Sequence, residues 1–149
     1  MTKLLPEDKA RELFETGAYT FVAVDASNKV LASSEKGVKP LTNLLDGGVS
    51  LDGFSACDKI VGRAASFLYI LLSVDSLYAE TLSLQGKELL ERYGIAVSYK
   101  ILCDEIISRD GTDICPMDKA VLGVDDPIVA YDCIKRKQQE LGIVSDKRV

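Results

Sequence analysis

The chain has 149 residues, of which 47% are hydrophobic and 28% charged, and its net charge is −5. This length and composition favour one soluble globular domain over residues 1–149, whose core needs no disulfide or metal. The acidic balance and the lack of a long basic run argue against nucleic acid as a partner. No apolar run is long enough to cross a bilayer, so no membrane partner is expected.

Cysteine usage indicates a reducing environment. The four cysteines, Cys57, Cys103, Cys115 and Cys133, lack the paired spacing of metal ligands, and the chain has no histidine. We therefore expect free thiols, no metal site and no cofactor. Because the first residues, MTKLLPEDKA, lack the apolar stretch of a signal peptide, the predicted location is the cytoplasm.

The first third of the chain predicts a helix followed by a hairpin. Residues 6–16 begin at a proline and stop before a glycine, as short helices do. Residues 19–26 alternate and are rich in strand formers, and residues 29–34 are expected to return as the second strand. A short amphipathic helical segment, PLTNLL, follows at residues 40–45.

Residues 55–73 carry apolar side chains at helical spacing and predict a buried central helix. Ser55 and Asp58 resemble a capping box at its start. The polar first turn is expected to open towards a cleft.

The remaining elements alternate between strand and helix. Strands are predicted at residues 76–81 and 96–102 and helices at 85–93, 116–121 and 126–141, with an irregular segment at 103–116 and a frayed end at 142–149. A strand–helix–strand unit within one sheet implies parallel pairing with a right-handed crossover. The predicted fold class is α/β, a three-layer α/β/α sandwich with a mixed sheet.

A hairpin followed by a helix that starts at a polar triplet resembles the cytidine deaminase fold. In those enzymes the second helix opens with His-x-Glu or Cys-x-Glu and the third with Pro-Cys-x-x-Cys, and these residues hold zinc and shuttle protons. In this resemblance Cys57 falls on a ligand position, Lys59 replaces the glutamate, and the third helix, SLQGKELL, has no cysteine. Zinc-dependent deamination is therefore not expected.

The whole chain resembles more closely an uncharacterised bacterial and archaeal family that has a deaminase-like fold without the zinc motif. The segments that carry the resemblance are GFSACDKIVGRAAS, LYAETLS and ISRDGTDICPMDKAVLGVDDP. This resemblance implies the fold but no particular activity.

The start of the predicted central helix holds the first candidate site. Cys57 is either a thiolate nucleophile stabilised by the helix dipole or an inert buried thiol. Lys59 and either Asp58 or Asp110 are the candidate proton-transfer groups, and Lys59 is also a candidate anion ligand. The purely structural alternative for Lys59 is a surface charge or an ion pair with Asp58 or Asp110. For Gly62, which is otherwise placed in the ligand site, it is helix-to-strand packing.

The irregular segment supplies the second candidate site, formed by Arg109, Asp110, Gly111, Thr112 and Cys115. A long irregular segment in a compact domain is often a binding loop, and an arginine fork suits phosphate or carboxylate. An ordinary Asp-Gly turn explains the same residues equally well. Glu80 is a weaker candidate, placed at the end of a strand.

Two hypotheses follow. In the first, a zinc-independent domain binds a small anionic or nucleotide-like ligand between residues 57–59 and the 109–115 loop. In the second, the chain is a non-catalytic interaction or regulatory module that acts by oligomerising. An enclosed pocket with Lys59 and Arg109 pointing inwards favours the first; exposed apolar surface with both charges outward favours the second.

Overall fold

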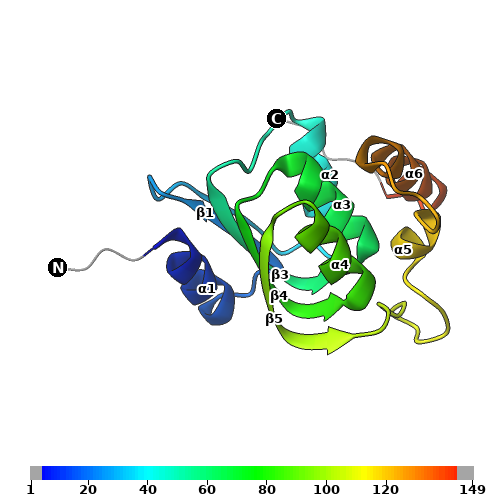
Figure 1. The fold of residues 1–149 in the computed structure, drawn as a ribbon, viewed down its shortest axis with the longest axis horizontal. Helices are drawn as coiled ribbons and strands as arrows, with labels where there is room; N and C mark the ends of the chain where they lie inside the picture. Colours follow the sequence, from blue (N-terminus) through cyan, green and yellow to red (C-terminus); the bar gives the residue numbers. More distant parts are fainter. Residues whose placement is uncertain (1–4, 144–149) are drawn as a thin grey trace.

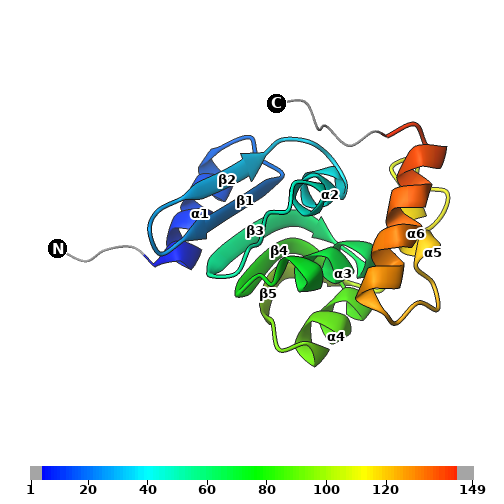
Figure 2. The ribbon, with the colours of Figure 1, turned by 90° about the horizontal axis from the view of Figure 1, so that it is seen from above.

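The computed structural model of the chain describes residues 5–143, so fraying at 144–149 lies outside the described residues. The elements in chain order are α1 (Pro6–Thr16), β1 (Phe21–Asp25), β2 (Val30–Ser33), α2 (Lys39–Asp46), β3 (Phe54–Val61), α3 (Arg63–Leu72), β4 (Ser76–Ser83), α4 (Leu84–Arg92), β5 (Ala96–Cys103), α5 (Pro116–Ala120) and α6 (Pro127–Glu140). The strands form one sheet in the order β2-β1-β3-β4-β5 (Figure 2).

The sheet is mixed, as expected. β1 pairs antiparallel with β2 and β3, whereas β3, β4 and β5 are parallel to one another. The hairpin closes because the Asp25 carboxylate accepts hydrogen bonds from the backbone N–H groups of Ser27 and Lys29, both at 2.9 Å. Asn28 takes the left-handed conformation there, with φ 67°. The helical crossovers α3 and α4 make the later strands parallel.

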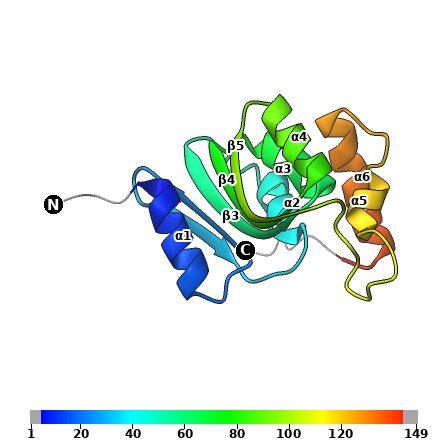
Figure 3. The same ribbon diagram turned by 60° about the horizontal axis from the view of Figure 1, so that its bottom comes forward.

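Helices cover the two faces of the sheet unequally. On one face α1 packs against β1 and β3. The opposite face carries α2, α3 and α4, and α5 and α6 pack against the outside of α3 (Figures 1 and 3). This arrangement is consistent with the predicted three-layer sandwich. It leaves the α1 face of β4 and β5 much more open than the other face.

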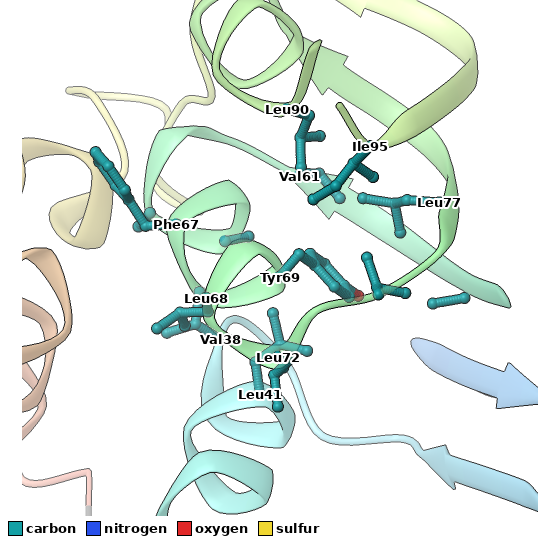
Figure 4. Close-up of a cluster of buried hydrophobic side chains, with 14 of the residues drawn as sticks. Val38, Leu41, Val61, Phe67, Leu68, Tyr69, Leu72, Leu77, Leu90 and Ile95 are labelled. Carbon is teal, nitrogen blue, oxygen red and sulfur yellow. The ribbon is translucent and has the colours of Figure 1, made fainter. Parts of the chain in front are cut away.

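The main core lies between the sheet and α3. Figure 4 shows Phe67, Leu68, Tyr69 and Leu72 of this helix among side chains from the sheet and from neighbouring helices, and all four are fully buried. A helix enclosed by a sheet on one side and by α2, α4 and α6 on others needs apolar residues around most of its circumference. The expected burial of residues 63–72 is therefore confirmed.

The prediction of one helix over residues 55–73 is wrong in its first half. β3 takes up Phe54–Val61, and α3 begins at Arg63 after the N-cap residue Gly62. β3 is buried on both faces at residues 56–58, and its apolar residues continue the helical spacing of α3, so periodicity alone could not distinguish this strand from a helix. The capping box is also wrong, since Ser55 lies in β3 and its hydroxyl accepts a hydrogen bond from the Ser76 hydroxyl on the adjacent strand β4 at 2.9 Å.

Candidate functional site

Cys57 lies on β3, not at a helix start, and faces α1. It is 1% exposed and packs in a small apolar cluster with Ala10, Phe14 and Val22. Burial raises the pKa of its thiol to about 12, and the nearby positive charge of Arg11 only partly opposes this. The predicted helix N-terminus, which would stabilise a thiolate, is absent from this position, so burial in an apolar cluster supports an inert thiol.

Asp58 points to the opposite face of β3 and is buried beneath α3. The Tyr69 hydroxyl donates a hydrogen bond to its Oδ2 at 2.6 Å, and the backbone N–H of Ile60 approaches Oδ1 at 3.4 Å. Desolvation raises the pKa of the Asp58 carboxyl to about 7, although these hydrogen bonds lower it. Burial and the neighbouring carboxyl also raise the pKa of Tyr69. The side chain is enclosed in the core, away from the predicted cleft.

Lys59 is exposed, as a surface charge would be. Its neighbours in β3, residues 58 and 60, align with Ala79 and Thr81 of β4, which align in turn with residues 99 and 101 of β5. The positions beside Lys59 are therefore occupied by Glu80 on β4 and by Lys100 on β5. Glu80 was expected at a strand end, but β4 continues to Ser83, so it sits within the strand. Within residues 5–143 no ion pair joins these three charges.

Gly62 provides space for the carboxylate of Asp118, a residue that the sequence did not single out. Asp118, the third residue of α5, is buried, and its Oδ1 accepts a hydrogen bond from the Ala64 backbone N–H at 2.9 Å. A Cβ on Gly62 would lie 2.1 Å from Asp118 Oδ2. Desolvation raises the pKa of Asp118, opposed by hydrogen bonds from the N–H groups of Ala64 and Arg63. The chain's own carboxylate therefore caps α3.

Arg63 closes the same end of α3 from the other side. Its Nε donates to the Val121 carbonyl at 3.3 Å, and its Nη2 contacts the Val124 carbonyl and lies 3.5 Å from Asp125 Oδ1. Two side chains, Asp118 and Arg63, thus tie the α5–α6 region to the start of α3. This end of the helix is occupied by internal contacts and does not open towards a ligand cleft.

The 109–115 loop is organised around Asp110. Its Oδ1 accepts from the Ser108 hydroxyl at 2.6 Å and from the hydroxyl and backbone N–H of Thr112 at 2.7 and 3.1 Å. These hydrogen bonds lower the pKa of Asp110 to about 2. Gly111 has a positive φ of 74°, which an Asp-Gly turn requires. The polar groups are therefore satisfied within the turn, which is what the plain-turn alternative expects.

Arg109 and Cys115 flank this turn, and their side chains take no part in its hydrogen bonds. Arg109 is exposed, and its Nη2 lies 4.0 Å from where a Cβ on Gly37 would stand, just before α2. Cys115 is the N-cap residue of α5, and its backbone N–H donates to the Ile106 carbonyl at 2.8 Å. Among the described residues no hydrogen bond or ion pair links residues 57–59 to the 109–115 loop. Within residues 5–143 the two predicted halves of the site therefore share no direct polar contact.

A shallow groove of about 320 Å³ opens elsewhere, between the start of α1 and the amino ends of β3, β4 and β5. Its rim carries Glu7, Asp8 and Arg11, and Tyr78 and Ser98 are among its other lining residues. The Arg11 guanidinium lies 3.6 Å from the centre of the Tyr78 ring and pairs with Glu15 at 3.1 Å. With its one cation already engaged and two carboxylates beside it, this groove is a poor fit for an anion.

Neither a metal cluster nor a membrane span is found in the part of the chain that the structure describes. No group of three or more His, Cys, Asp or Glu side chains there is arranged to hold a metal ion. All four cysteines are free. No helix within residues 5–143 is both long enough and apolar enough to cross a membrane.

Comparison with known proteins places the chain in a family. A family model described as a domain of unknown function, DUF1893 (TM1506), matches residues 9–138. The chain belongs to the DUF1893 family. A crystal structure of a DUF1893 family protein from Thermotoga maritima is similar, with a TM-score of 0.81 and 28% sequence identity over 87% of this chain and 88% of that one. No match was found among curated proteins.

The DUF1893 match confirms the expectation of an uncharacterised family with a bacterial member. Its span includes every candidate residue from Cys57 to Cys115, together with Asp118 and all of β5. Sequence reasoning missed Asp118 because a lone aspartate in a five-residue helix carries no local sign of its partner. The one available hint was Gly62, since a glycine before an apolar run indicates a close approach by another group.

Proposed function

We propose that this chain is a non-catalytic interaction module that assembles with copies of itself through the free edge of β5. The observation that carries the proposal is the eight-residue edge strand β5, AVSYKILC, whose outer side pairs with no other strand within residues 5–143 and which has large apolar side chains at the surface. Tyr99 is 40% exposed, Ile101 51% and Leu102 38%. An edge of this length, without proline or glycine, is a template for pairing with another strand.

The positions of the sequence-predicted charges support the same function. Lys59 and Arg109 are both exposed. Outward charges together with exposed apolar side chains on the edge strand are what an interaction surface presents. Cys57 and Asp58, the other candidate catalytic groups, contribute to the packing of the core.

The test compares two isoleucines aligned across the sheet, since both Ile60 and Ile101 align with Thr81. Ile101→Lys changes the edge strand, whereas Ile60→Lys makes the same change on a central strand at similar exposure. Sedimentation velocity is expected to show that Ile101→Lys weakens self-association and that Ile60→Lys leaves it nearly unchanged. A monomeric wild-type chain, or an assembly indifferent to Ile101→Lys, would contradict the proposal.

Binding of a small anionic or nucleotide-like ligand is a second candidate function. It is favoured by two exposed cations, Lys59 and Arg109, which have no ion pair or side-chain hydrogen bond within residues 5–143. Calorimetric titration with inorganic phosphate and with a nucleoside monophosphate tests it. Lys59→Ala and Arg109→Ala are expected to weaken binding, and Arg92→Ala, on α4, serves as the control. Equal binding by all three variants would exclude this site.

We further propose that the architecture is cytidine deaminase-like. The support is the helix, hairpin, helix and subsequent strand–helix–strand order, combined with the mixed sheet. Superposition on zinc-dependent cytidine deaminases, element by element, tests this. A different strand order in those enzymes would contradict it.

A further inference from the structure

The free edge of β5 is the long edge of the sheet. β5 has eight residues and one charge, Lys100, whereas β2 at the other edge has four residues. In Figure 1, β5 forms the lower border of the molecule, and no labelled element lies beyond it. Natural sheets protect long edges with prolines, bulges, charges or covering segments. This one carries a single lysine, which leaves room for a partner strand.

The residues of β5 are nearly symmetrical in character about Tyr99. Ser98 and Lys100 are its polar neighbours, and beyond them stand apolar pairs, Val97 with Ile101 and Ala96 with Leu102. An antiparallel copy with Tyr99 opposite Tyr99 therefore sets polar residues against polar and apolar against apolar. This is the self-complementarity that a two-fold interface requires. A central pair of tyrosines adds an aromatic cross-strand contact.

Other registers fit less well. A two-fold axis at Lys100 would bring two ammonium groups directly opposite each other, which is destabilising. An axis at Ser98 would set Lys100 against Ala96 and leave Ile101 and Leu102 outside the paired residues. An axis at Ile101 would place Lys100 against Leu102. The register centred on Tyr99 is the one that pairs the whole apolar edge without a charge conflict.

The same register also places opposite charges close together. Ser98 aligns with Tyr78 and Cys57, on the face that carries α1, and it lines the groove rimmed by Glu7 and Asp8. Directly opposed residues of an antiparallel pair lie on the same face of the sheet. Lys100 of the second copy would therefore stand beside Ser98, at the side of the groove that carries the two carboxylates.

We infer that two copies of the chain pair their β5 strands antiparallel about a two-fold axis at Tyr99, so that each Lys100 reaches the acidic groove of the other copy. The inference rests on the proposed function and specifies its partner and geometry. The two sheets then form one continuous sheet. On its α1 face the two grooves come together, each completed by a residue from the other copy.

A charge-swap experiment tests the axis. Tyr99→Glu and Tyr99→Lys each place two like charges on the axis, and each is expected to weaken the dimer by about tenfold or more. Mixed in equal amounts, with one of the two variants uniformly labelled with ¹⁵N, they are expected to form heterodimers, which native mass spectrometry then distinguishes from both homodimers by mass. Circular dichroism of each variant checks that the monomer is folded.

A cross-link provides a second, independent measurement. In a chain with Cys103→Ser, Cys115→Ser and Cys133→Ser, Tyr99→Cys is expected to form an intermolecular disulfide on mild oxidation, and Ser98→Cys in the same background is not. If Ile101→Lys dissociates the assembly but Tyr99→Cys does not cross-link and the mixture forms no heterodimer, the inferred register is overturned and the proposed function stands. If Ile101→Lys has no effect, or the wild-type chain is a monomer, both are overturned.

Discussion

The carboxylate of Asp118 lies so close to Gly62 that a Cβ there would stand 2.1 Å from Oδ2. The backbone of Gly62 is extended, with φ −106° and ψ −162°, so an alanine meets no conformational obstacle. The requirement for glycine is therefore steric and comes from a residue 56 positions later in the chain. It explains why a glycine precedes the most deeply buried helix.

Gly62→Ala is expected to destabilise the protein by about 1–3 kcal/mol, because the added methyl group must displace a buried carboxylate. In an Asp118→Ala background the same substitution is expected to cost much less. Urea unfolding of the two single variants and the double variant measures the coupling energy. Strict additivity would show that Asp118 is not what Gly62 accommodates.

Asp118→Ala is expected to destabilise the chain by about 1–3 kcal/mol, because the Ala64 N–H at the start of α3 loses its buried acceptor. Asp125→Ala is the matched control, since Asp125 contacts the same end of α3 through Arg63 but is highly exposed. Its substitution is expected to change stability by about 0.5 kcal/mol or less. Equal losses for the two variants, measured by thermal unfolding, would argue against the cap.

The stability of the protein is expected to fall as the pH rises from acid to neutral because of Asp58. Its pKa is raised from 3.8 to about 7 in the folded chain, so between these values the folded state binds more protons than the unfolded state. Under that condition stability decreases with rising pH, by up to about 1.4 kcal/mol per pH unit. The stabilisation from protonated Asp58 is fully present below the pKa of the unfolded chain, 3.8, and is lost as the pH rises through the pKa of the folded chain, about 7.

Asp58→Asn is the variant that isolates this effect, since it keeps a hydrogen-bonding partner for Tyr69 without a titrating proton. Urea unfolding at about pH 5 and about pH 8 is expected to show a smaller difference for this variant than for the wild-type chain. An unchanged difference would mean that another group causes the pH dependence.

Cys57 is expected to be the slowest thiol to react in the folded chain. It is 1% exposed and burial raises its pKa to about 12, whereas Cys103, Cys115 and Cys133 are only partly buried. Alkylation with iodoacetamide followed by peptide mass spectrometry measures the order of labelling, and labelling in urea is the control in which all four react. Preferential labelling of Cys57 in the native state would restore the reactive interpretation.

Much of the architecture was determined by local sequence. The prolines and glycines around residues 6–16, the alternation in the hairpin and the strand–helix–strand order up to β5 predicted elements and pairings that the structure confirms. Turn chemistry, caps and the strand preference of β-branched and aromatic residues act within a few residues, so they can be read along the chain. The same holds for the turn at Asp110, whose polar partners are its sequence neighbours.

Tertiary structure alone decided which secondary structure residues 54–61 adopt and what surrounds them. A strand buried on both faces has the composition of a buried helix, and the choice depends on β1 and β4, which pair with it on either side. That choice sent Cys57 and Asp58 to opposite faces of the sheet and brought Asp118 to Gly62. Contacts between residues far apart in the chain leave no periodic pattern in the sequence. The burial of Cys57 and Asp58 and the position of β5 at the edge of the sheet could therefore be recognised only from the tertiary structure.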